Sequence, residues 1–384
     1  MRAPTDHLEL PFFDTAHREL GACLADWLPQ QTVDEHDDSA ATRAWVRLLG
    51  SNQWLRYCVP AAHGGLLPQL DSRALVVLRE TLAFHSPLAD FAFAMQGLGS
   101  GAITLDGSAA QRTAYLPAVA RGDKIAAFAL SEPGAGSDAG ALQTTAVRDG
   151  DGYVIDGVKT WISNGGIADF YCVFAKTAPA QGTRGISAFI VDAHTPGLEI
   201  AERIATMSPH PLATLRFARC KVPATALLGA ENAGFKLAMR TLDIFRASVA
   251  GAALGMARRA LDEAVQHART REMFGHTLAD FQLTQARLGE LAAQLDGAAL
   301  LTYRAAWLRD VRGARTTAQA AMAKLSATET AQRVIDAALQ LHGGLGVKVG
   351  SKVEALYRDI RALRIYEGAS EVQQLIIGRE VLKP

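Results

Sequence analysis

Glu367, near the C-terminal end of the chain, is the residue whose surroundings best suit acid–base chemistry. It follows two bulky residues, Ile365 and Tyr366, and precedes a glycine and an alanine. Ser370 and Gln373 form a capping-box pattern, which predicts that a helix starts just after this turn. A carboxylate in such a dry turn would have a raised pKa and could act as a general base near neutral pH. The alternative is a solvated glutamate in a first helical turn, favoured by the helix dipole.

Two earlier segments have the composition of ligand-binding loops. Residues 131–138 are rich in glycine and serine, so their backbone N–H groups and hydroxyls can face an anionic or carbonyl-rich ligand. Residues 161–165 begin with a tryptophan close to a serine, which could cover one face of a planar ring and hydrogen-bond to its edge. A purely structural turn and a half-buried core tryptophan are the ordinary alternatives.

Features that could contact a ligand also occur near the ends of the predicted C-terminal helices. Arg271 stands at the end of a long predicted helix, where its guanidinium could hold a phosphate, and Gln282 lies in the first turn of the next helix. Gln340 precedes the pair Gly343–Gly344, past which a ligand could run closely. Each feature is weak evidence by itself, so their order along the chain carries the interpretation.

Hydrophobic periodicity predicts the elements that must position these residues. Up to about residue 121 the pattern is helical, with an amphipathic stripe over residues 11–28, and a capping box at Ser108 predicts a short helix that stops at Pro117. Short β-prone runs follow at intervals and predict strands; they cover residues 125–130, 144–147, 170–175 and 186–191, with residues 153–157 ending in a hairpin turn. This spacing predicts a small antiparallel barrel or sandwich.

The helical period returns after about residue 231. Long helices are expected over residues 235–271, from residue 280, and over residues 317–341, and the stretch 250–253 is rich in alanine and glycine, so that another helix could approach closely. The α+β chain should therefore comprise an N-terminal helical domain of residues 1–121, a central β-domain of residues 122–230 and a C-terminal four-helix-type bundle of residues 231–384.

Composition restricts the class of protein. With 384 residues, 49% of them hydrophobic, the chain has material for two or three domains. Lys plus Arg and Asp plus Glu number 39 each, which argues against binding to nucleic acid or an anionic membrane. The four cysteines are widely spaced, which predicts reduced thiols and no metal site. Because no signal peptide or segment of about 20 apolar residues is present, we expect a cytoplasmic protein without a membrane span.

Taken together, these segments resemble the acyl-CoA dehydrogenase family over nearly the whole chain. The matching segments keep the family's order and cover residues 126–140, 161–165, 243–246, 271–282, 340–344 and 364–371. The resemblance implies N-terminal helices, a central β-domain and a C-terminal bundle, with bound FAD. It also implies a homotetramer in which one subunit's C-terminal domain completes its neighbour's FAD site, and an electron-transfer flavoprotein as electron acceptor.

The resemblance also implies roles for individual residues. Glu367 matches the catalytic base that takes the α-proton of an acyl-CoA thioester while flavin N5 receives the β-hydride. The positions that match contacts to FAD are Leu130, Ser131, Gly136, Ser137, Trp161, Ser163, Arg271, Phe274, Gln282, Gln340, Gly343, Gly344, Ala369, Ser370 and Glu371. The positions that match contacts to the substrate are Ser137, Asp243, Arg246, Tyr366 and Gly368.

Some positions depart from the family's pattern. Phe245 stands where one branch of the family has its glutamate base, which favours Glu367 as the base here. The phenyl ring could narrow the acyl cavity and select a short, branched or flat acyl group, or it could simply pack in the core. Residues 207–214 replace a loop that is usually longer and rich in Gly and Arg. Two alternative functions stay open, namely the same reaction on a carrier-protein-bound acyl group and a flavin-binding relative without dehydrogenase activity.

Overall fold

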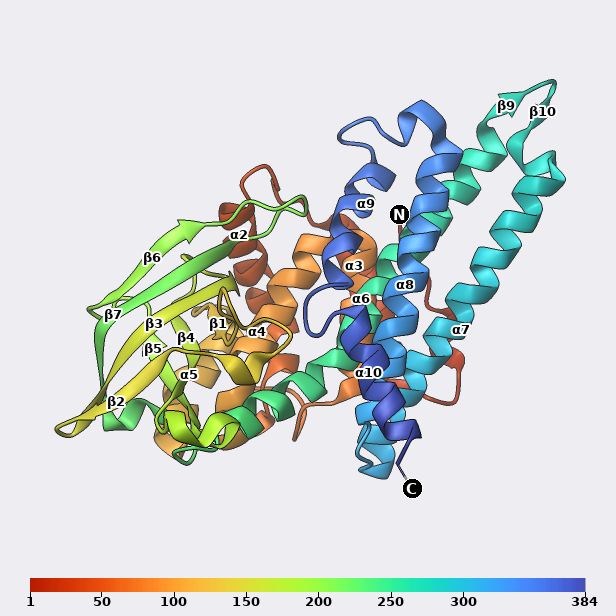
Figure 1. Cartoon of the computed structure of the whole chain (residues 1–384). Helices are drawn as coiled ribbons and strands as arrows, with labels where there is room; N and C mark the ends of the chain where they lie inside the picture. The colour runs from red at the N-terminus through yellow and green to blue at the C-terminus, as the bar shows by residue number, and fades with distance from the viewer. Residues whose placement is uncertain (384) are drawn as a thin grey trace. The chain divides into compact units, whose positions relative to one another are not determined.

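The computed structural model describes residues 1–383 and has helices before and after a β-sheet region, so the predicted α+β class is confirmed (Figure 1). The chain forms two compact units. The helical unit contains Met1–Thr32, Ser72–Asp90 and the chain from Arg246 onward, and the sheet unit contains Val33–Asp71 and Phe91–Phe245.

Five α-helices precede the sheet. They are α1 (Thr15–Trp27), α2 (Asp38–Ser51), α3 (Ser72–His85), α4 (Pro87–Asp106) and α5 (Ala109–Arg121). The capping box of Ser108 and Gln111 is confirmed at the start of α5. The prediction that this helix stops at Pro117 is wrong, because α5 continues to Arg121 and ends on Gly122. Leu116 and Val119 are buried on either side of the proline, and this packing outweighs the one backbone hydrogen bond that proline removes.

The sheet unit contains one main sheet, whose strands lie side by side in Figure 1. Its strands are β1 (Ala126–Ala129), β2 (Thr145–Asp149), β3 (Gly152–Ser163), β4 (Phe170–Lys176), β5 (Ile186–Asp192), β6 (Leu198–Arg203), β7 (Leu212–Pro223) and β8 (Leu227–Leu228). Their order is β6-β7-β3-β2-β4-β5-β8, and β1 pairs with β4. Most ladders are antiparallel as predicted, but β1 and β2 each pair with β4 in parallel.

The buried runs in β4 and β5 supply the core of this sheet. Residues 170–175 and 186–191 are buried throughout, as expected for strands covered on both faces. The predicted turn after residues 153–157 is wrong, since β3 continues through Gly157 to Ser163. Gly157 has a φ of 149° and the β3–β7 register shifts between Ile155 and Gly157, so the glycine marks a bulge inside the strand instead of its end.

The C-terminal part of the chain is helical apart from one small hairpin. Its elements are α6 (Gly234–Thr270), β9 (Glu272–Met273), β10 (His276–Thr277), α7 (Gln282–Arg312), α8 (Thr317–His342), α9 (Lys352–Leu363) and α10 (Ser370–Val381). Within the helical unit, α7, α9 and α10 all pack against α8 (Figure 1). The close approach predicted at residues 250–253 is confirmed, because a Cβ at Gly251 would lie 2.8 Å from the Val76 carbonyl oxygen of α3.

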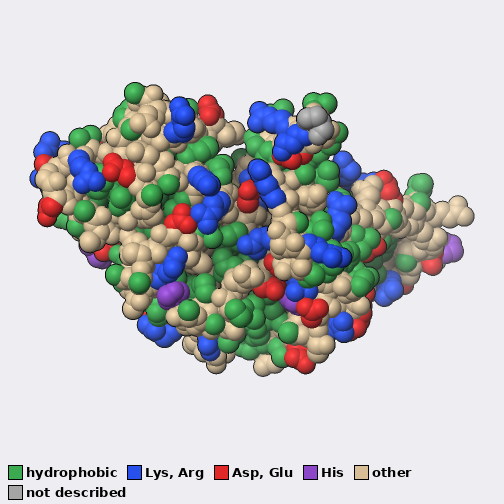
Figure 2. Space-filling view, turned by 90° about the horizontal axis from the view of Figure 1, so that it is seen from below, with side chains coloured by type: hydrophobic (Ala, Val, Ile, Leu, Met, Phe, Trp, Pro, Cys, Tyr) green, Lys and Arg blue, Asp and Glu red, His purple; other side chains and the backbone are tan. Residues whose placement is uncertain are grey.

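Charged side chains are intermixed on the surface. Figure 2 shows Lys and Arg side chains next to Asp and Glu side chains, with hydrophobic groups between them, over the face displayed. Among residues 1–383, no helix is both long enough and apolar enough to cross a membrane.

Candidate active site

The turn between α9 and α10 carries Glu367 in an uncommon backbone conformation. Glu367 has a φ of 52° and Gly368 a φ of 94°, so two successive residues are left-handed. A non-glycine residue in this region costs on the order of 1 kcal/mol or more and persists only where the surrounding structure holds it. The backbone thus turns sharply at the predicted base.

Helix α10 begins at Ser370 as predicted, but the capping box is wrong. The N-cap residue is Ala369, and no side chain caps the helix. Ser370 Oγ instead donates to Glu329 Oε1 of α8 at 2.6 Å. Gln373 Nε2 turns back and donates to the Gly368 carbonyl at 2.8 Å and to the Glu367 carbonyl at 3.4 Å. The two side chains that the sequence pattern assigned to the helix end are therefore engaged elsewhere, Ser370 with a distant helix and Gln373 with the preceding turn.

The carboxyl group of Glu367 is in a dry position. Its Oε2 atom is buried and has no hydrogen-bond partner among the residues that the structure describes. Burial raises the pKa of this carboxyl group. The positive charges of Arg79, Lys324 and Arg246 act in the opposite direction. A buried acceptor without a partner, held above its ordinary pKa, is suited to receiving a proton.

A buried ion pair stands beside this turn in the helical unit. Arg79 of α3 donates to both carboxylate oxygens of Asp90 at 2.8 and 2.9 Å and to Ser248 Oγ at 3.0 Å. Asp90 thereby offsets most of the guanidinium charge, so Glu367 is not held as its ion-pair partner. Burial also raises the pKa of Tyr366, which keeps its phenol neutral.

Lys324 of α8 was missed at the sequence level. It is 0% exposed, and its Nζ atom donates to the Gly368 carbonyl at 2.8 Å. Burial lowers the pKa of Lys324 to about 8, while Glu367 favours the charged form. The sequence holds one signal, since the lysine lies in the alanine-rich run of residues 318–327, where neighbouring positions form an apolar helix face.

In the sheet unit, a buried ion pair supports the glycine-rich loop. Lys159 Nζ donates to the Leu130 carbonyl at 3.0 Å and to Glu132 Oε1 at 2.8 Å. The Glu132 carboxylate also accepts from the backbone N–H of Thr144 at 2.9 Å. Gly136 has no atom within 4 Å of an added Cβ, so the rim of the loop is open to a ligand. The sequence pattern predicted the loop but not the Lys159–Glu132 ion pair beneath it.

Trp161 lies next to this loop and is presented outward. The Thr160 N–H donates to the Ser131 carbonyl at 3.0 Å, which joins the two predicted binding segments. Trp161 has a φ of 59° and is 59% exposed, so it is not the half-buried core residue of the alternative interpretation. Ser163 is partly buried and Ser137 is exposed. An exposed aromatic ring beside an open Gly/Ser loop fits one face and the polar edge of a flavin.

The remaining predicted cofactor positions lie in the helical unit, mostly at helix ends. His267 of α6 stacks on His342 of α8 with ring centroids 4.2 Å apart, so the C-terminal ends of these helices lie together. This places Arg271 and the 340–344 segment at one end of the bundle. The members exposed on the single chain are Arg271, Phe274, Gln282, Gln340, Gly343, Gly344 and Glu371. Ala369 is partly buried, and Ser370 is buried against Glu329.

Two of the predicted substrate positions follow each other closely on α6. Asp243 is partly buried and belongs to the sheet unit, whereas Arg246 is buried and belongs to the helical unit. Within the helical unit, Arg246 acts electrostatically on Glu367. Tyr366 and Gly368 flank Glu367 in the turn and are partly buried.

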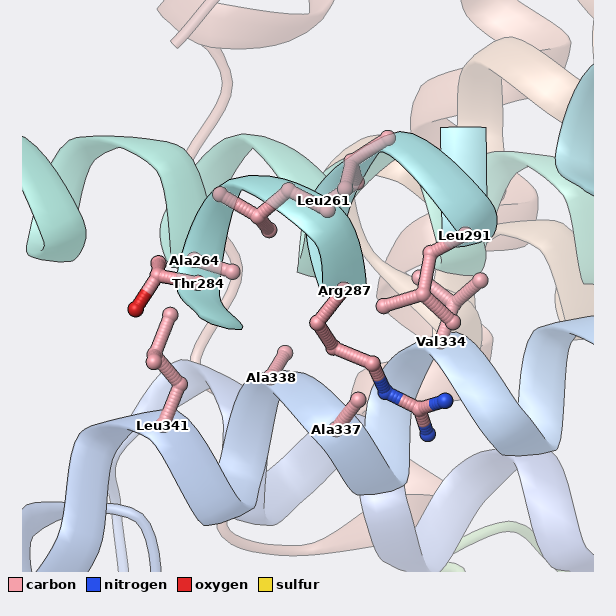
Figure 3. A pocket seen from close by; sticks show the side chains of 10 residues that line it. Leu261, Ala264, Thr284, Arg287, Leu291, Val334, Ala337, Ala338 and Leu341 are labelled. Carbon is pink, nitrogen blue, oxygen red and sulfur yellow. The ribbon is translucent and has the colours of Figure 1, made fainter. Parts of the chain in front are cut away.

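Other potential sites contribute nothing to this picture. In the described part of the chain, no group of three or more His, Cys, Asp or Glu side chains could hold a metal ion. A cavity of about 30 Å³ lies between α6, α7 and α8 (Figure 3). Apolar side chains such as Leu261, Leu291 and Leu341 line most of it. This volume has room for about a water molecule and not for a flavin or an acyl chain.

Comparison with known proteins identifies relatives of the whole chain. Three family models match in succession: the acyl-CoA dehydrogenase N-terminal domain over residues 17–123, the middle domain over residues 127–220 and the C-terminal domain over residues 232–382. The human mitochondrial short-chain specific acyl-CoA dehydrogenase is 40% identical over 373 residues, which cover 96% of this chain and 88% of the relative.

Two further matches extend this comparison. The caffeyl-CoA reductase–Etf complex subunit CarC of Acetobacterium woodii is 41% identical over 316 residues, which cover 82% of this chain and 83% of the relative. The structure of butyryl-CoA dehydrogenase from Megasphaera elsdenii superposes with a TM-score of 0.90 at 32% identity and covers 97% of this chain and 99% of that one.

Proposed function

Because this chain belongs to the acyl-CoA dehydrogenase family, we propose that Glu367 removes the α-proton of an acyl-CoA thioester in an α,β-dehydrogenation. The family consists of oxidoreductases that bind FAD, and family membership supports a flavin-dependent dehydrogenation of acyl-CoA. The observation that carries the role of Glu367 is its buried Oε2 atom, which has no hydrogen-bond partner among residues 1–383. Bound FAD supplies the acceptor for the β-hydride.

The same turn also offers a donor to the substrate. Backbone hydrogen bonds of this turn use the N–H groups of Ile365 and Tyr366, and none in the described chain uses that of Glu367. We propose that this N–H donates to the thioester oxygen and stabilises the negative charge that develops there as the α-proton leaves. Glu367 thus acts through its backbone and its side chain on neighbouring atoms of one thioester.

The predicted binding residues divide into groups with different tasks. In the sheet unit, Leu130, Ser131, Gly136, Ser137, Trp161 and Ser163 would hold the flavin ring. In the helical unit, Arg271, Phe274, Gln282, Gln340, Gly343 and Gly344 would reach the ADP part of FAD in an adjacent subunit, with Ala369, Ser370 and Glu371 as further contacts. Ser137, Asp243, Arg246, Tyr366 and Gly368 would contact the substrate.

The exposed side chains of Phe274 (85%) and Leu283 (87%) support burial of the bundle end that carries Arg271 in an oligomer. We propose a homotetramer, which light scattering of the purified holoprotein would measure.

We further propose that an electron-transfer flavoprotein accepts the electrons. The name of the relative from Acetobacterium woodii, a reductase–Etf complex subunit, supports this partner. Because Glu367 can return the proton that it takes, the redox partner decides whether oxidation of the acyl group or reduction of the enoyl group prevails.

Substitution Glu367→Gln tests the proposal. The variant should fold and keep its yellow flavin, but its flavin bleaching by acyl-CoA under anaerobic conditions should slow by about three orders of magnitude, as expected for loss of a general base. Glu290→Gln is a suitable control, because Glu290 is an exposed residue of α7 paired with Arg287. Bleaching at a near-normal rate in Glu367→Gln would refute the role of Glu367.

The alternatives can be separated with the same assay. An enzyme for carrier-bound acyl groups would be bleached by an acyl-carrier protein and poorly by the matching acyl-CoA. A flavin-binding relative without dehydrogenase activity would be bleached by neither.

A further inference from the structure

The Glu367–Gly368 turn needs an external restraint. Two successive left-handed residues, the first of them not a glycine, form a conformation that an isolated chain would leave. The two carbonyl groups of this turn point to the side chains that hold it. Gln373 Nε2 donates to both, at 3.4 Å for Glu367 and 2.8 Å for Gly368.

Lys324 makes the second contact with the Gly368 carbonyl, at 2.8 Å. The turn and Gln373 approach each other so closely that a Cβ at Gly368 would lie 2.4 Å from Gln373 Nε2. One carbonyl oxygen thus accepts from both Lys324 and Gln373. Only the first of these donors carries a charge.

The charges around Glu367 come from several elements. Arg79 of α3 is paired with Asp90 at the start of α4, so its charge is largely offset. Arg246 of α6 also acts on Glu367, which it helps to keep ionised. Lys324 differs from Arg79 because its Nζ atom donates to a carbonyl group, which leaves its positive charge to act on the nearby carboxylate.

Negative groups close to Lys324 are engaged elsewhere or exposed. Glu329, which follows Lys324 on α8, accepts from Arg364 Nε at 2.8 Å and from Ser370 Oγ at 2.6 Å. Glu371 is exposed to solvent on α10. Among the charged groups that act on Lys324, Glu367 has the largest effect.

We propose that Lys324 is a positioning residue of the reaction, which fixes the Glu367–Gly368 turn through the Gly368 carbonyl and favours the ionised carboxylate of Glu367 through its charge. The proposal rests on the proposed function, since it assigns Lys324 a task only if Glu367 is the base. A lysine with a merely structural role would support the fold without changing how the rate depends on pH.

Three variants separate the hydrogen bond from the charge. Lys324→Met removes both, Lys324→Gln keeps an amide donor without charge, and Gln373→Met removes the neutral hydrogen bonds while the charge stays. The measurement is the anaerobic rate of flavin bleaching between pH 5 and 9 with butyryl-, isobutyryl- and 3-phenylpropionyl-CoA as probes. Flavin content and thermal midpoint are recorded for each variant.

Both Lys324 variants should shift the acid limb of the rate profile to higher pH, by about one unit, because a nearby cation lowers the pKa of a carboxyl group. Lys324→Met should also lower the plateau rate about tenfold or more, since the turn loses a restraint. Gln373→Met should lower the plateau and leave the acid limb in place.

An unchanged acid limb in Lys324→Gln and Lys324→Met with normal flavin content would overturn the proposal. If Lys324→Met does not fold, Lys324→Gln gives the same decision, because it retains a donor to Gly368. Failure of the proposed function is a different result, since then the wild-type flavin is not bleached by any probe or Glu367→Gln is bleached normally.

Discussion

At Glu367, burial and nearby charge act in opposite directions on one carboxyl group. Burial is the larger effect and raises the pKa, while Arg79, Lys324 and Arg246 limit the rise. A carboxylate that was firmly paired with one of these cations would be a poor proton acceptor. Because Asp90 already pairs with Arg79, the base is surrounded by positive charge without being held by an ion pair there.

This balance predicts the pH dependence of the free enzyme. The base must be ionised to act, and its pKa is raised above the ordinary glutamate value of 4.5. The value of kcat/KM should therefore fall on the acid side through a pKa above 4.5, because the protonated form is inactive. Steady-state kinetics across pH, with an artificial electron acceptor, would measure this fall of kcat/KM on the acid side. If kcat/KM falls through a pKa at or below 4.5, the nearby positive charges outweigh the effect of burial on Glu367.

At the scale of elements, Gly97 and Gly101 of α4 form a notch that receives Phe245 from the start of α6 within the sheet unit. A Cβ at Gly97 would lie 2.6 Å from Phe245 Cε1, and one at Gly101 would lie 3.1 Å from Phe245 Cε2. The Phe245 ring is 2% exposed and fills this notch. Packing in the notch thus accounts for this ring, one residue before Arg246 on α6, and a role in acyl selection stays a prediction.

Substitution Gly97→Ala should destabilise the protein by about 1–3 kcal/mol, because a methyl group would overlap the Phe245 ring. The double variant Gly97→Ala/Phe245→Leu should recover part of the loss, since the smaller side chain leaves room. Urea denaturation followed by circular dichroism would measure both.

The matched control for this notch is Gly289→Ala in α7. No atom lies within 4 Å of an added Cβ there, so the change should be neutral or stabilise the helix by up to about 1 kcal/mol. Equal midpoints for Gly97→Ala and wild type would contradict the packing argument.

At the scale of the whole molecule, a cofactor should contribute strongly to stability. The open Gly/Ser loop, the exposed ring of Trp161 and the exposed residues at the bundle end leave polar and apolar groups to be covered by a ligand. A ligand that binds only the folded state adds about 4 kcal/mol to the free energy of unfolding when its free concentration is a thousandfold above its dissociation constant.

Removal of FAD should accordingly lower the thermal midpoint, and added FAD should restore it in a saturable manner. Differential scanning calorimetry of the stripped and reloaded protein measures this effect. Riboflavin, which lacks the ADP part, should restore less, and Arg271→Ala should weaken the response to FAD more than the response to riboflavin. Identical thermal midpoints with and without FAD would argue against a specific FAD site in this protein.

Local residue types and their spacing were enough to predict the order of elements, the motifs and the candidate base. Periodicity located long helices such as α6 and α8 and the buried strands β4 and β5, because each repeat depends on neighbours within a few residues. The turn around Glu367 was likewise visible from local residue types. Domain boundaries at residues 121 and 230 and the roles of the binding residues stay predictions.

The surroundings of these residues depend on contacts between segments that lie far apart in the chain. Lys324 meets Gly368 across 44 positions, and Lys159 meets Glu132 across 27, so neither partnership leaves a local pattern. A lysine on an alanine-rich helix looks the same in sequence whether solvent or protein covers it, since burial depends on elements that arrive from far along the chain. For the same reason, Ser370 matched a helix cap in sequence, while its hydroxyl donates to Glu329 across 41 positions.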